Sequence, residues 1–482
     1  MGSTDSTSAE RDSPVPLWNR LLAPALREQA KKVWLWLAVG LVVRVVLLPW
    51  FASVDLLSNI YVTSVLVDHH QLLNTTADPP PIFFLNGGLD FLVRPWISSQ
   101  IGSVFSGGAS FTPDYEPQAL AANMPGINLL IAVLKVPYLV ADLAIAFLLP
   151  RFFNDSRAAF VALLLWWFNP ISIFVSYMVG QYDIIATAFV LGAFYALRTD
   201  RKVACTAALG FAIIFEVFAI LLVPFILIYW VRTSRGWVSR AWAGFQAVLG
   251  PFLAVAGLAT IYRFQPTYYE PANVAVGGRL VNGYYGSLLY SRGEVTHLSL
   301  SGLWTWIGYS SQFPISTDLS DVILLVVVAY GLLVFAVYSA RELTWDHIWA
   351  ASLATFLVIY GLSGFVVQWV LWSLPFLILL LTKDLRRHIL PYLVFLSGYF
   401  VYVCYFGAAL TGTLLQVSYP PAVAFNPITW LDDLGLNGPE VLNIGRSLFS
   451  AACLWFLFLT LREPFFSRFW PASNPVAPRT PG

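Results

Sequence analysis

The sequence predicts an all-α membrane protein whose chain crosses the bilayer about ten times. Of its 482 residues, 58% are hydrophobic and only 11% are charged, whereas a soluble globular chain carries roughly 25% charged residues. The chain also contains 19 Trp, a residue type enriched where membrane helices meet the lipid headgroups. Apolar runs recur along the whole chain, and many have the ~20 residues that a membrane crossing needs.

Ten apolar runs are long enough to be crossings. In chain order they are 34–51, 126–149, 157–179, 181–197, 238–261, 320–339, 347–364, 367–382, 389–411 and 445–461. The stretch 203–231 differs, because basic residues flank both ends, at Lys202 and Arg232. Split at Glu216, each arm makes roughly 20 Å of helix. The sequence therefore predicts a hairpin of two short helices there.

Basic residues set the expected orientation. With both chain ends in the cytoplasm, most of the 27 Lys and Arg residues fall on the cytoplasmic side. The exceptions are five outer arginines and two residues within spans: Arg94, Arg263, Arg279, Arg292 and Arg446, then Arg44 and Lys135. The expected organisation is a cytoplasmic tail (1–33), a transmembrane domain (34–461) and a second cytoplasmic tail (462–482).

This orientation produces three long outer loops, at 52–125, 262–319 and 412–444. Long loops within a compact fold are usually functional or disordered, so we expect the chemistry on the extracytoplasmic or lumenal face. The first loop contains two apolar stretches, 54–67 and 82–97, which we expect to form interfacial helices.

The net charge and the spacing of Cys and His residues exclude further classes of function. The net charge of +1 gives no basic surface for nucleic acid. Cys205, Cys404 and Cys453 lie far apart in apolar runs, and the pair His69–His70 has no third ligand at a suitable spacing. The sequence therefore predicts neither a disulfide, a metal nor a cofactor. The polar N-terminus lacks the pattern of a cleaved signal peptide, so the first span is expected to be retained.

Asp55 is the first candidate for chemistry, because it lies just beyond the outer end of the first span. A carboxylate at a membrane boundary is partly desolvated, which raises its pKa and suits it to general-base catalysis. The alternative is an N-cap for a helix that begins near Leu56. Tyr61, six residues further on, is a second candidate in the same segment.

The segment 169–183, NPISIFVSYMVGQYD, is the second candidate. Asn-Pro within an apolar run breaks the helix and frees backbone polar groups. Gln181, Tyr182 and Asp183 then fall at the outer junction of two spans, where they would project polar groups into a crevice. The alternative is a turn with capping side chains.

Ionisable residues inside the spans usually face the protein interior. Lys135 and Asp142 share a helix face but lie about 10 Å apart along the axis, too far for a direct pair, and a structural role is favoured for Asp142. Glu216, at the hairpin tip, is either a site residue or an internal tie to another helix. Gln368 lies beside Trp369, which is either a belt residue or part of a binding segment.

Outer arginines are candidates for binding a lipid phosphate, Arg263 and Arg279 among them. The alternative is a solvated or lipid-facing charge at each position.

Together these motifs resemble the GT-C fold of membrane glycosyltransferases, over about residues 40–235 with a weaker similarity at 361–380. The matching positions are Arg44, Asp55 and Tyr61, then Lys135 to Asp142, then Asn169-Pro170 with Gly180 to Asp183, and finally Gln368 to Pro375. One position departs from the pattern: many members of that superfamily have Lys where this chain has Glu216.

The resemblance implies inverting transfer of a hexose, with mannose as the expected sugar, from a polyprenyl-phosphate donor in the outer leaflet to a glycan or glycolipid. Asp55 would be the general base, while Arg44, Tyr61, Gln181, Tyr182, Asp183, Glu216, Arg263, Arg279 and Gln368 would bind substrate. Its partners would be that donor, that acceptor and membrane lipids, with no nucleic acid. Two alternatives remain: a secondary transporter or flippase, which broken helices and intramembrane charges also indicate, and a non-catalytic subunit, which Glu216 favours.

Overall fold

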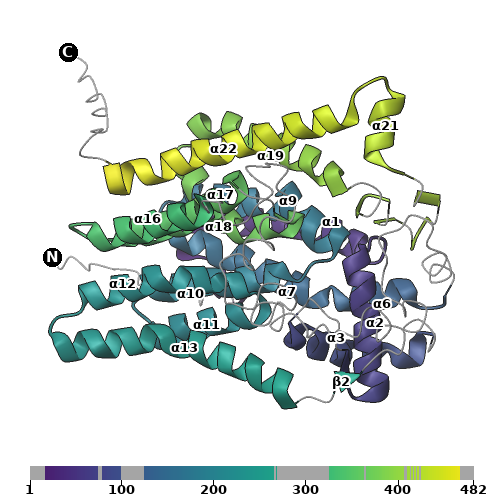
Figure 1. Cartoon of the computed structure of the whole chain (residues 1–482), viewed down its shortest axis with the longest axis horizontal. Helices are drawn as coiled ribbons and strands as arrows, with labels where there is room; N and C mark the ends of the chain where they lie inside the picture. Colours follow the sequence, from purple (N-terminus) through teal and green to yellow (C-terminus); the bar gives the residue numbers. More distant parts are fainter. Residues whose placement is uncertain are drawn as a thin grey trace, which may run out of the picture.

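The computed structural model describes most of the chain, in several segments. These are residues 17–73, 79–98, 124–264, 267–268, 325–362, 365–406 and 425–466, with short pieces between 410 and 422. Over these residues the protein is a bundle of helices with roughly parallel axes, and shorter helices lie across one end (Figure 1). The all-α prediction is confirmed apart from one addition. A two-residue strand β1 (Leu72–Leu73) pairs in parallel with β2 (Thr267–Tyr268) and so joins the first two predicted outer loops.

The helices of the bundle end mostly where the sequence predicts. They are α1 (Ala30–Leu47), α6 (Ile127–Leu134), α7 (Val136–Leu148), α8 (Ser156–Trp167), α9 (Pro170–Ile173), α10 (Asp183–Arg198), α11 (Lys202–Phe215), α12 (Val223–Thr233), α13 (Trp237–Phe264), α16 (Leu325–Ser339), α17 (Trp345–Leu362), α18 (Val370–Lys383), α19 (Leu385–Val403) and α22 (Gly438–Phe466). The helices across the end are α2 (Val54–His69), α3 (Pro80–Val93) and α21 (Pro427–Asp433).

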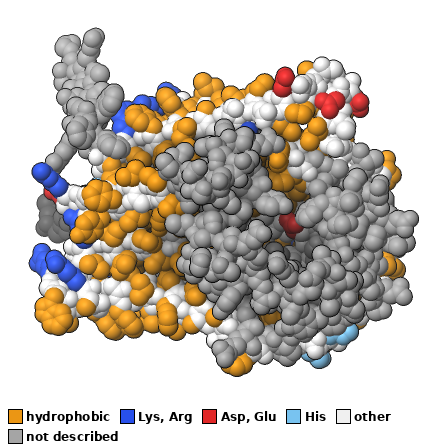
Figure 2. All heavy atoms as spheres, viewed as in Figure 1, with side chains coloured by type: hydrophobic (Ala, Val, Ile, Leu, Met, Phe, Trp, Pro, Cys, Tyr) orange, Lys and Arg blue, Asp and Glu red, His pale blue; other side chains and the backbone are white. Residues whose placement is uncertain are grey.

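Five helical segments of the described chain are long and apolar enough to cross a membrane: Ile127–Phe152, Ser156–Val179, Trp237–Ile261, Leu385–Phe406 and Gly438–Arg462. They coincide with five of the ten predicted crossings, and the chain is an integral membrane protein. Helices also lie at the other five predicted positions, but each falls short in length, in apolar character or in freedom from charged residues. Ten crossings therefore stays a prediction. Large apolar side chains project outward from α13 and α22, such as Phe252 and Phe458, as expected of helices that face lipid (Figure 2).

The predicted hairpin at 203–231 is confirmed. α11 ends at Phe215, Glu216 has an extended backbone (φ −147°, ψ 114°), and a 3₁₀ turn at Val217–Leu222 leads into α12. The ammonium group of Lys202, where α11 begins, lies 5.9 Å from the ring centroid of Trp230, near the end of α12. Both arms therefore start and finish at the same end of the bundle.

Two glycines allow α11 to cross α13 at close range. A Cβ atom on Gly210 would lie 2.8 Å from the carbonyl oxygen of Gly250, and the Gly250 N–H donates a 2.9 Å hydrogen bond to the Thr206 hydroxyl. Small residues at a crossing let membrane helices approach until their backbones touch. Close backbone packing thus holds the hairpin to α13.

We expect Gly210→Ala to destabilise the protein by about 1–3 kcal/mol, because the added methyl group must push the Gly250 backbone away. Gly192→Ala in α10 is the matched control, since a Cβ there meets nothing within 4 Å and alanine favours helix. Unfolding in detergent would compare the two variants. Equal stability of both would show that the crossing is not tightly packed.

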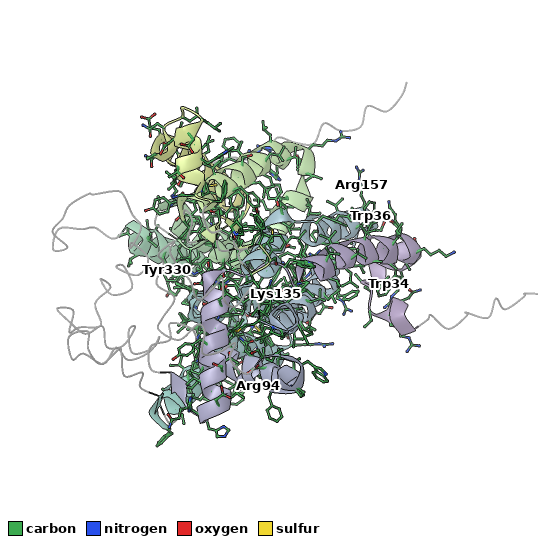
Figure 3. All side chains as sticks on the ribbon, turned by 90° about the vertical axis from the view of Figure 1, so that its right-hand side faces the viewer. Trp34, Trp36, Arg94, Lys135, Arg157 and Tyr330 are labelled. Carbon is green, nitrogen blue, oxygen red and sulfur yellow. The ribbon has the colours of Figure 1, made fainter. Side chains whose placement is uncertain are left out.

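The two ends of the bundle differ in charge. Lys and Arg gather at the end where α10, α12 and α18 finish and α11 begins, with Arg198, Arg232, Lys383 and Lys202 in those terminal turns (Figure 2). At the opposite end α2 lies across the bundle (Figures 1 and 3). The stretches 54–67 and 82–97 are helical, as expected: they form α2, and α3 with its following 3₁₀ turn, Arg94–Trp96. Their position at the membrane interface stays a prediction.

Candidate functional site

Asp55 and Gln181 meet at the end of the bundle that α2 covers. The Gln181 side-chain amide donates a 2.5 Å hydrogen bond to Oδ2 of Asp55, across 126 residues of sequence. Gln181 is buried, and the Asp55 side chain is partly exposed. The two strongest candidates of the sequence analysis are therefore in direct contact.

Asp55 is not the N-cap of its helix, and that interpretation is wrong. The cap is Ser53, whose hydroxyl accepts a 3.4 Å hydrogen bond from the Leu56 N–H. Asp55 lies one residue inside α2, in its first turn, where the helix dipole favours a negative charge. Its carboxylate is thus available for a role other than capping.

Burial and hydrogen bonding act on the Asp55 carboxyl in opposite directions. Desolvation raises its pKa above the ordinary value, and the hydrogen bond from Gln181 lowers it by the smaller amount. The net effect is a carboxyl with a raised pKa, which holds a proton more strongly than an exposed aspartate.

The backbone around Gly180 brings the two residues together. Gly180 has a φ of +81°, and a Cβ on it would lie 2.7 Å from Cδ2 of Leu56 in α2. On the other side of this contact, the Ser53 N–H donates to the carbonyl oxygen of Val179 at 3.2 Å. A residue with a side chain at 180 would be strained and would also displace α2. Glycine here therefore sets the distance between Asp55 and Gln181.

Lys135 bonds, from inside the bundle, to the two segments that lead to Asp55 and to Gln181. Its ammonium group donates to the carbonyl oxygens of Leu48 at 3.2 Å, Tyr177 at 2.7 Å and Phe51. Leu48 and Phe51 precede Asp55, while Tyr177 precedes Gln181 within a π-helical turn at Phe174–Val179. Figure 3 shows Lys135 beside α2, seen from this end of the molecule. The ammonium satisfies three carbonyls that irregular backbone leaves without helical partners, as the membrane interior requires.

We expect Lys135→Met to destabilise the protein by roughly 2–4 kcal/mol, because three buried carbonyls lose a charged donor at once. The matched control is Lys202→Met at the opposite end, where the ammonium lies over the Trp230 ring and is more exposed. Detergent denaturation would measure both. Wild-type stability of the Lys135 variant would mean that the three carbonyls find other donors.

Tyr182 and Asp183 follow Gln181 in the chain and extend this group of polar residues away from Asp55. Both are buried at the start of α10, and the Asp183 carboxylate acts electrostatically on the hydroxyls of Tyr360 and Tyr399. Tyr182 occupies the N-cap position without a side-chain capping bond. Capping was the alternative for the polar residues of segment 169–183, and it is confirmed at Asn169, whose side-chain oxygen accepts from the Ile171 N–H at 3.0 Å. No side-chain capping bond is formed at the start of α10.

Three tyrosines, two of which interact with Asp183, hold a second irregular segment, 365–369, between α17 and α18. The hydroxyls of Tyr402, Tyr399 and Tyr360 donate to the carbonyl oxygens of Phe365, Val367 and Trp369, at 2.7, 3.0 and 2.5 Å. These tyrosines donate hydrogen bonds that α17 and α18 do not provide there. Gln368, half-buried, lies within this held segment.

Aromatic packing brings Glu216 toward the same segment. Phe218, two residues after Glu216, packs with ring centroids 4.8 Å from Trp369 and 4.7 Å from Trp372. Trp369 is 5% exposed, so it is not a belt residue at the lipid surface, and that alternative is wrong. Glu216 itself is buried. The hairpin tip and the Gln368 segment are therefore neighbours.

One outer arginine lies close to the tyrosine-held segment. The guanidinium carbon of Arg446 is 5.0 Å from the Phe365 ring centroid and 5.1 Å from that of Tyr402. Arg94 instead pairs with Asp68 and Asp90 at 2.9 and 3.1 Å. Arg279 and the Arg263 side chain lie outside the described residues. In the sequence Arg446 is one of five outer arginines, and nothing in its flanking residues separates it from the other four.

Arg44 does not join Asp55 but forms a buried ion pair deeper in the bundle. Its Nε atom is 2.6 Å from Oδ2 of Asp142, and the same carboxylate accepts from Trp166 at 2.7 Å and Tyr177 at 2.8 Å. The guanidinium also stacks 3.6 Å from the Trp167 ring centroid. Both charged side chains are fully buried. The expected structural role of Asp142 agrees with these contacts.

Two other candidates lie apart from Asp55. Tyr61 is buried in α2, but six residues of helix turn it about 120° away from Asp55. His69 and His70 are exposed at the far end of α2. Among the described residues, no group of three or more His, Cys, Asp or Glu side chains is arranged to hold a metal ion.

No protein-family model and no curated protein matches the sequence. Among solved structures, the chain is similar to ArnT from Cupriavidus metallidurans in the apo state, with 14% sequence identity and a TM-score of 0.40, over 91% of this chain and 78% of that one. A likeness this weak supports no conclusion about fold or function.

Proposed function

We propose that this protein is a membrane glycosyltransferase that moves a hexose from a polyprenyl-phosphate donor to a glycan or glycolipid. The observation that supports it best is the Asp55–Gln181 contact, a buried amide that orients a partly exposed carboxylate at one end of the bundle. The resemblance of the surrounding motifs to GT-C glycosyltransferases supplies the reaction class. The end opposite the basic residues would be extracytoplasmic or lumenal, with both chain ends in the cytoplasm.

In the proposed reaction Asp55 removes a proton from an acceptor hydroxyl, whose oxygen attacks the anomeric carbon of the donor. The bond between that carbon and the phosphate oxygen breaks on the opposite face, so the configuration inverts and polyprenyl phosphate leaves. Gln181 occupies Oδ2 of Asp55, which leaves Oδ1 to receive the proton. Arg446, with Arg263 and Arg279, is a candidate to stabilise charge on the leaving phosphate.

Substrate-binding roles for Tyr182, Asp183, Gln368 and Glu216 are part of the proposal, because these residues lie in the segments around Asp55 and the tyrosine-held turn. Arg44 and Tyr61 are weaker members, since both are buried away from Asp55. A lipid-linked donor suits an outward-facing site, because nucleotide sugars are cytosolic. Mannose is the proposed sugar, and glucose is the second choice.

The direct test is sugar transfer by the purified full chain in detergent. Polyprenyl-phosphate mannose, and then the glucose analogue, would be offered with lipid-linked glycans as acceptors. Inverted product from either donor supports the proposal. Failure with both donors and several acceptors would favour the transporter that the broken helices at 167–170 and 365–369 also suit, or a non-catalytic subunit.

We expect Gln181→Leu to move the acidic limb of the pH–rate profile to higher pH. The lost hydrogen bond lowered the Asp55 pKa, so the variant carboxyl stays protonated to a higher pH and the base is lost earlier as pH falls. A kcat/KM profile of wild type and variant would measure the shift. Gln368→Leu is the control with an unchanged limb, and a Gln181→Leu profile identical to wild type would contradict the role of Asp55.

A further inference from the structure

Two interruptions of the helices meet where α2 covers the bundle. One is the stretch 48–53 between α1 and α2, and the other is the stretch 174–182 between α9 and α10. Three contacts join the two stretches, and the residues of each contact are 126 positions apart. In chain order the contacts join Phe51 to Tyr177 through Lys135, Ser53 to Val179, and Asp55 to Gln181. The two stretches are therefore in register, and the Asp55–Gln181 contact is the last of three levels.

The middle level is a single backbone hydrogen bond. The Ser53 N–H donates to the Val179 carbonyl oxygen at 3.2 Å. One such bond fixes a distance, but the two stretches can still rotate about it. Asp55 and Gln181 each lie two residues further on, so a rotation there changes the distance between their side chains. A second contact, before the middle level, is needed to fix the orientation.

Lys135 supplies this second contact. Its ammonium donates to the carbonyl oxygen of Tyr177 at 2.7 Å and to that of Phe51, so that one group joins both stretches. The side chain is fully buried and lies at the break between α6 and α7. A Cβ atom on Gly180 would lie 3.2 Å from Cε of Lys135. The lysine stem thus packs directly against the turn that leads to Gln181.

The ammonium of Lys135 acts on the backbone and not on the Asp55 carboxylate. Burial and the bond from Gln181 are the two influences on the pKa of Asp55. Asp183, the charged residue two positions after Gln181, acts instead on Tyr360 and Tyr399. Any effect of Lys135 on Asp55 must therefore pass through the position of Gln181.

We propose that Lys135 is a positioning residue for Asp55, because it holds Phe51 and Tyr177 in register and so sets the contact with Gln181. The proposal rests on the proposed role of Asp55 as the general base. Without the ammonium, the Ser53–Val179 bond remains as a pivot. Gln181 then moves relative to Asp55, and the carboxylate loses the donor that orients it.

The test measures the protonation of Asp55 and needs no sugar donor. Dicyclohexylcarbodiimide reacts with the protonated form of a carboxyl group, so labelling of Asp55 in the purified full chain, followed by mass spectrometry across pH, gives a midpoint. Without the bond from Gln181, the carboxyl keeps its proton to higher pH. We expect Lys135→Met to raise the midpoint as Gln181→Leu does. The double variant should raise it no further, because both changes remove the same contact.

Lys135→Gln keeps two N–H donors, so it should fold even where Lys135→Met does not, and we expect a smaller shift in the same direction. Lys202→Met, at the opposite end of the bundle, is the matched control with a wild-type midpoint. Wild-type midpoints in both Lys135 variants would overturn the proposal. Additive shifts in the double variant would do so too, because they would show that the ammonium acts on the carboxylate independently of Gln181.

Sugar transfer separates this inference from the proposed function. With an active wild type, Lys135→Met should lose about 10²-fold in kcat with little change in KM, as for a reacting group held about 1 Å out of place. An unchanged kcat would contradict a positioning role. No transfer by wild type would refute the proposed function, while the labelling midpoints would still decide whether Lys135 sets the Asp55–Gln181 contact.

Discussion

Asp55→Asn is expected to lower kcat/KM for sugar transfer by about 10²- to 10⁴-fold, the range for removal of a general base. The amide keeps the size of the side chain, but it cannot take the proton of the acceptor hydroxyl. Because Ser53 rather than Asp55 caps α2, the substitution should leave the helix start intact. Donor binding should change little, so the loss should appear in kcat more than in KM.

The matched control is Asp68→Asn at the other end of α2. Asp68 is exposed and pairs with Arg94 at 2.9 Å, and an exposed pair contributes little to stability. We expect near wild-type transfer from this variant. Full activity in Asp55→Asn would keep the glycosyltransferase proposal but would exclude Asp55 as the base. Asp183 would then be the next candidate, since it is buried in the neighbouring segment.

Arg44→Met is expected to destabilise the protein by about 3–5 kcal/mol, the range for breaking a buried ion pair from one side. Asp142 would keep its hydrogen bonds from Trp166 and Tyr177, but its charge would lose its only ion-pair partner among the described residues. Equilibrium unfolding in mixed micelles would measure the change. A substrate-binding role for Arg44 would raise KM instead and leave stability near that of wild type.

The double variant Arg44→Met/Asp142→Leu is the control for this interpretation. Removing both charges leaves no unpaired ion, so we expect the double variant to be more stable than Arg44→Met alone. Additive losses would contradict a direct coupling across the 2.6 Å contact. Arg341→Met, an exposed arginine at the basic end, should be close to wild type.

Much of the candidate site could be predicted because its residues interrupt apolar runs. Asp55 and Gln181 are polar residues at span boundaries, and the distribution of basic residues places both boundaries at one end. That they touch could not be predicted, because the contact depends on a glycine turn and on helix packing across 126 residues. Ser53 and Asp55 are both good capping residues two positions apart, and only the backbone geometry decides between them.

The partners of Lys135 could not be predicted either, for a different reason. The spacing of Lys135 and Asp142 along one helix excludes a direct pair, and the structure agrees, because Asp142 pairs with Arg44 instead. The actual partners of Lys135 are three backbone carbonyls. Every residue has a carbonyl, so such partners leave no mark in a sequence, and only the breaks at 48–53 and 174–180 indicate where free ones occur.

The contacts around Asp55 and Lys135 also bear on how the protein is made. Lys135, Arg44 and Asp142, together with Asp55 and Gln181, all draw their partners from the stretch 40–181. Ribosomes release the N-terminal part of a chain first, and early segments can fold before later ones exist. The side-chain contact of Asp55 with Gln181 can therefore form during synthesis, once the first helices have entered the bilayer, whereas the backbone bond from the Ala52 N–H to the Leu414 carbonyl forms later. The later helices then arrive at a partly finished site and close around it.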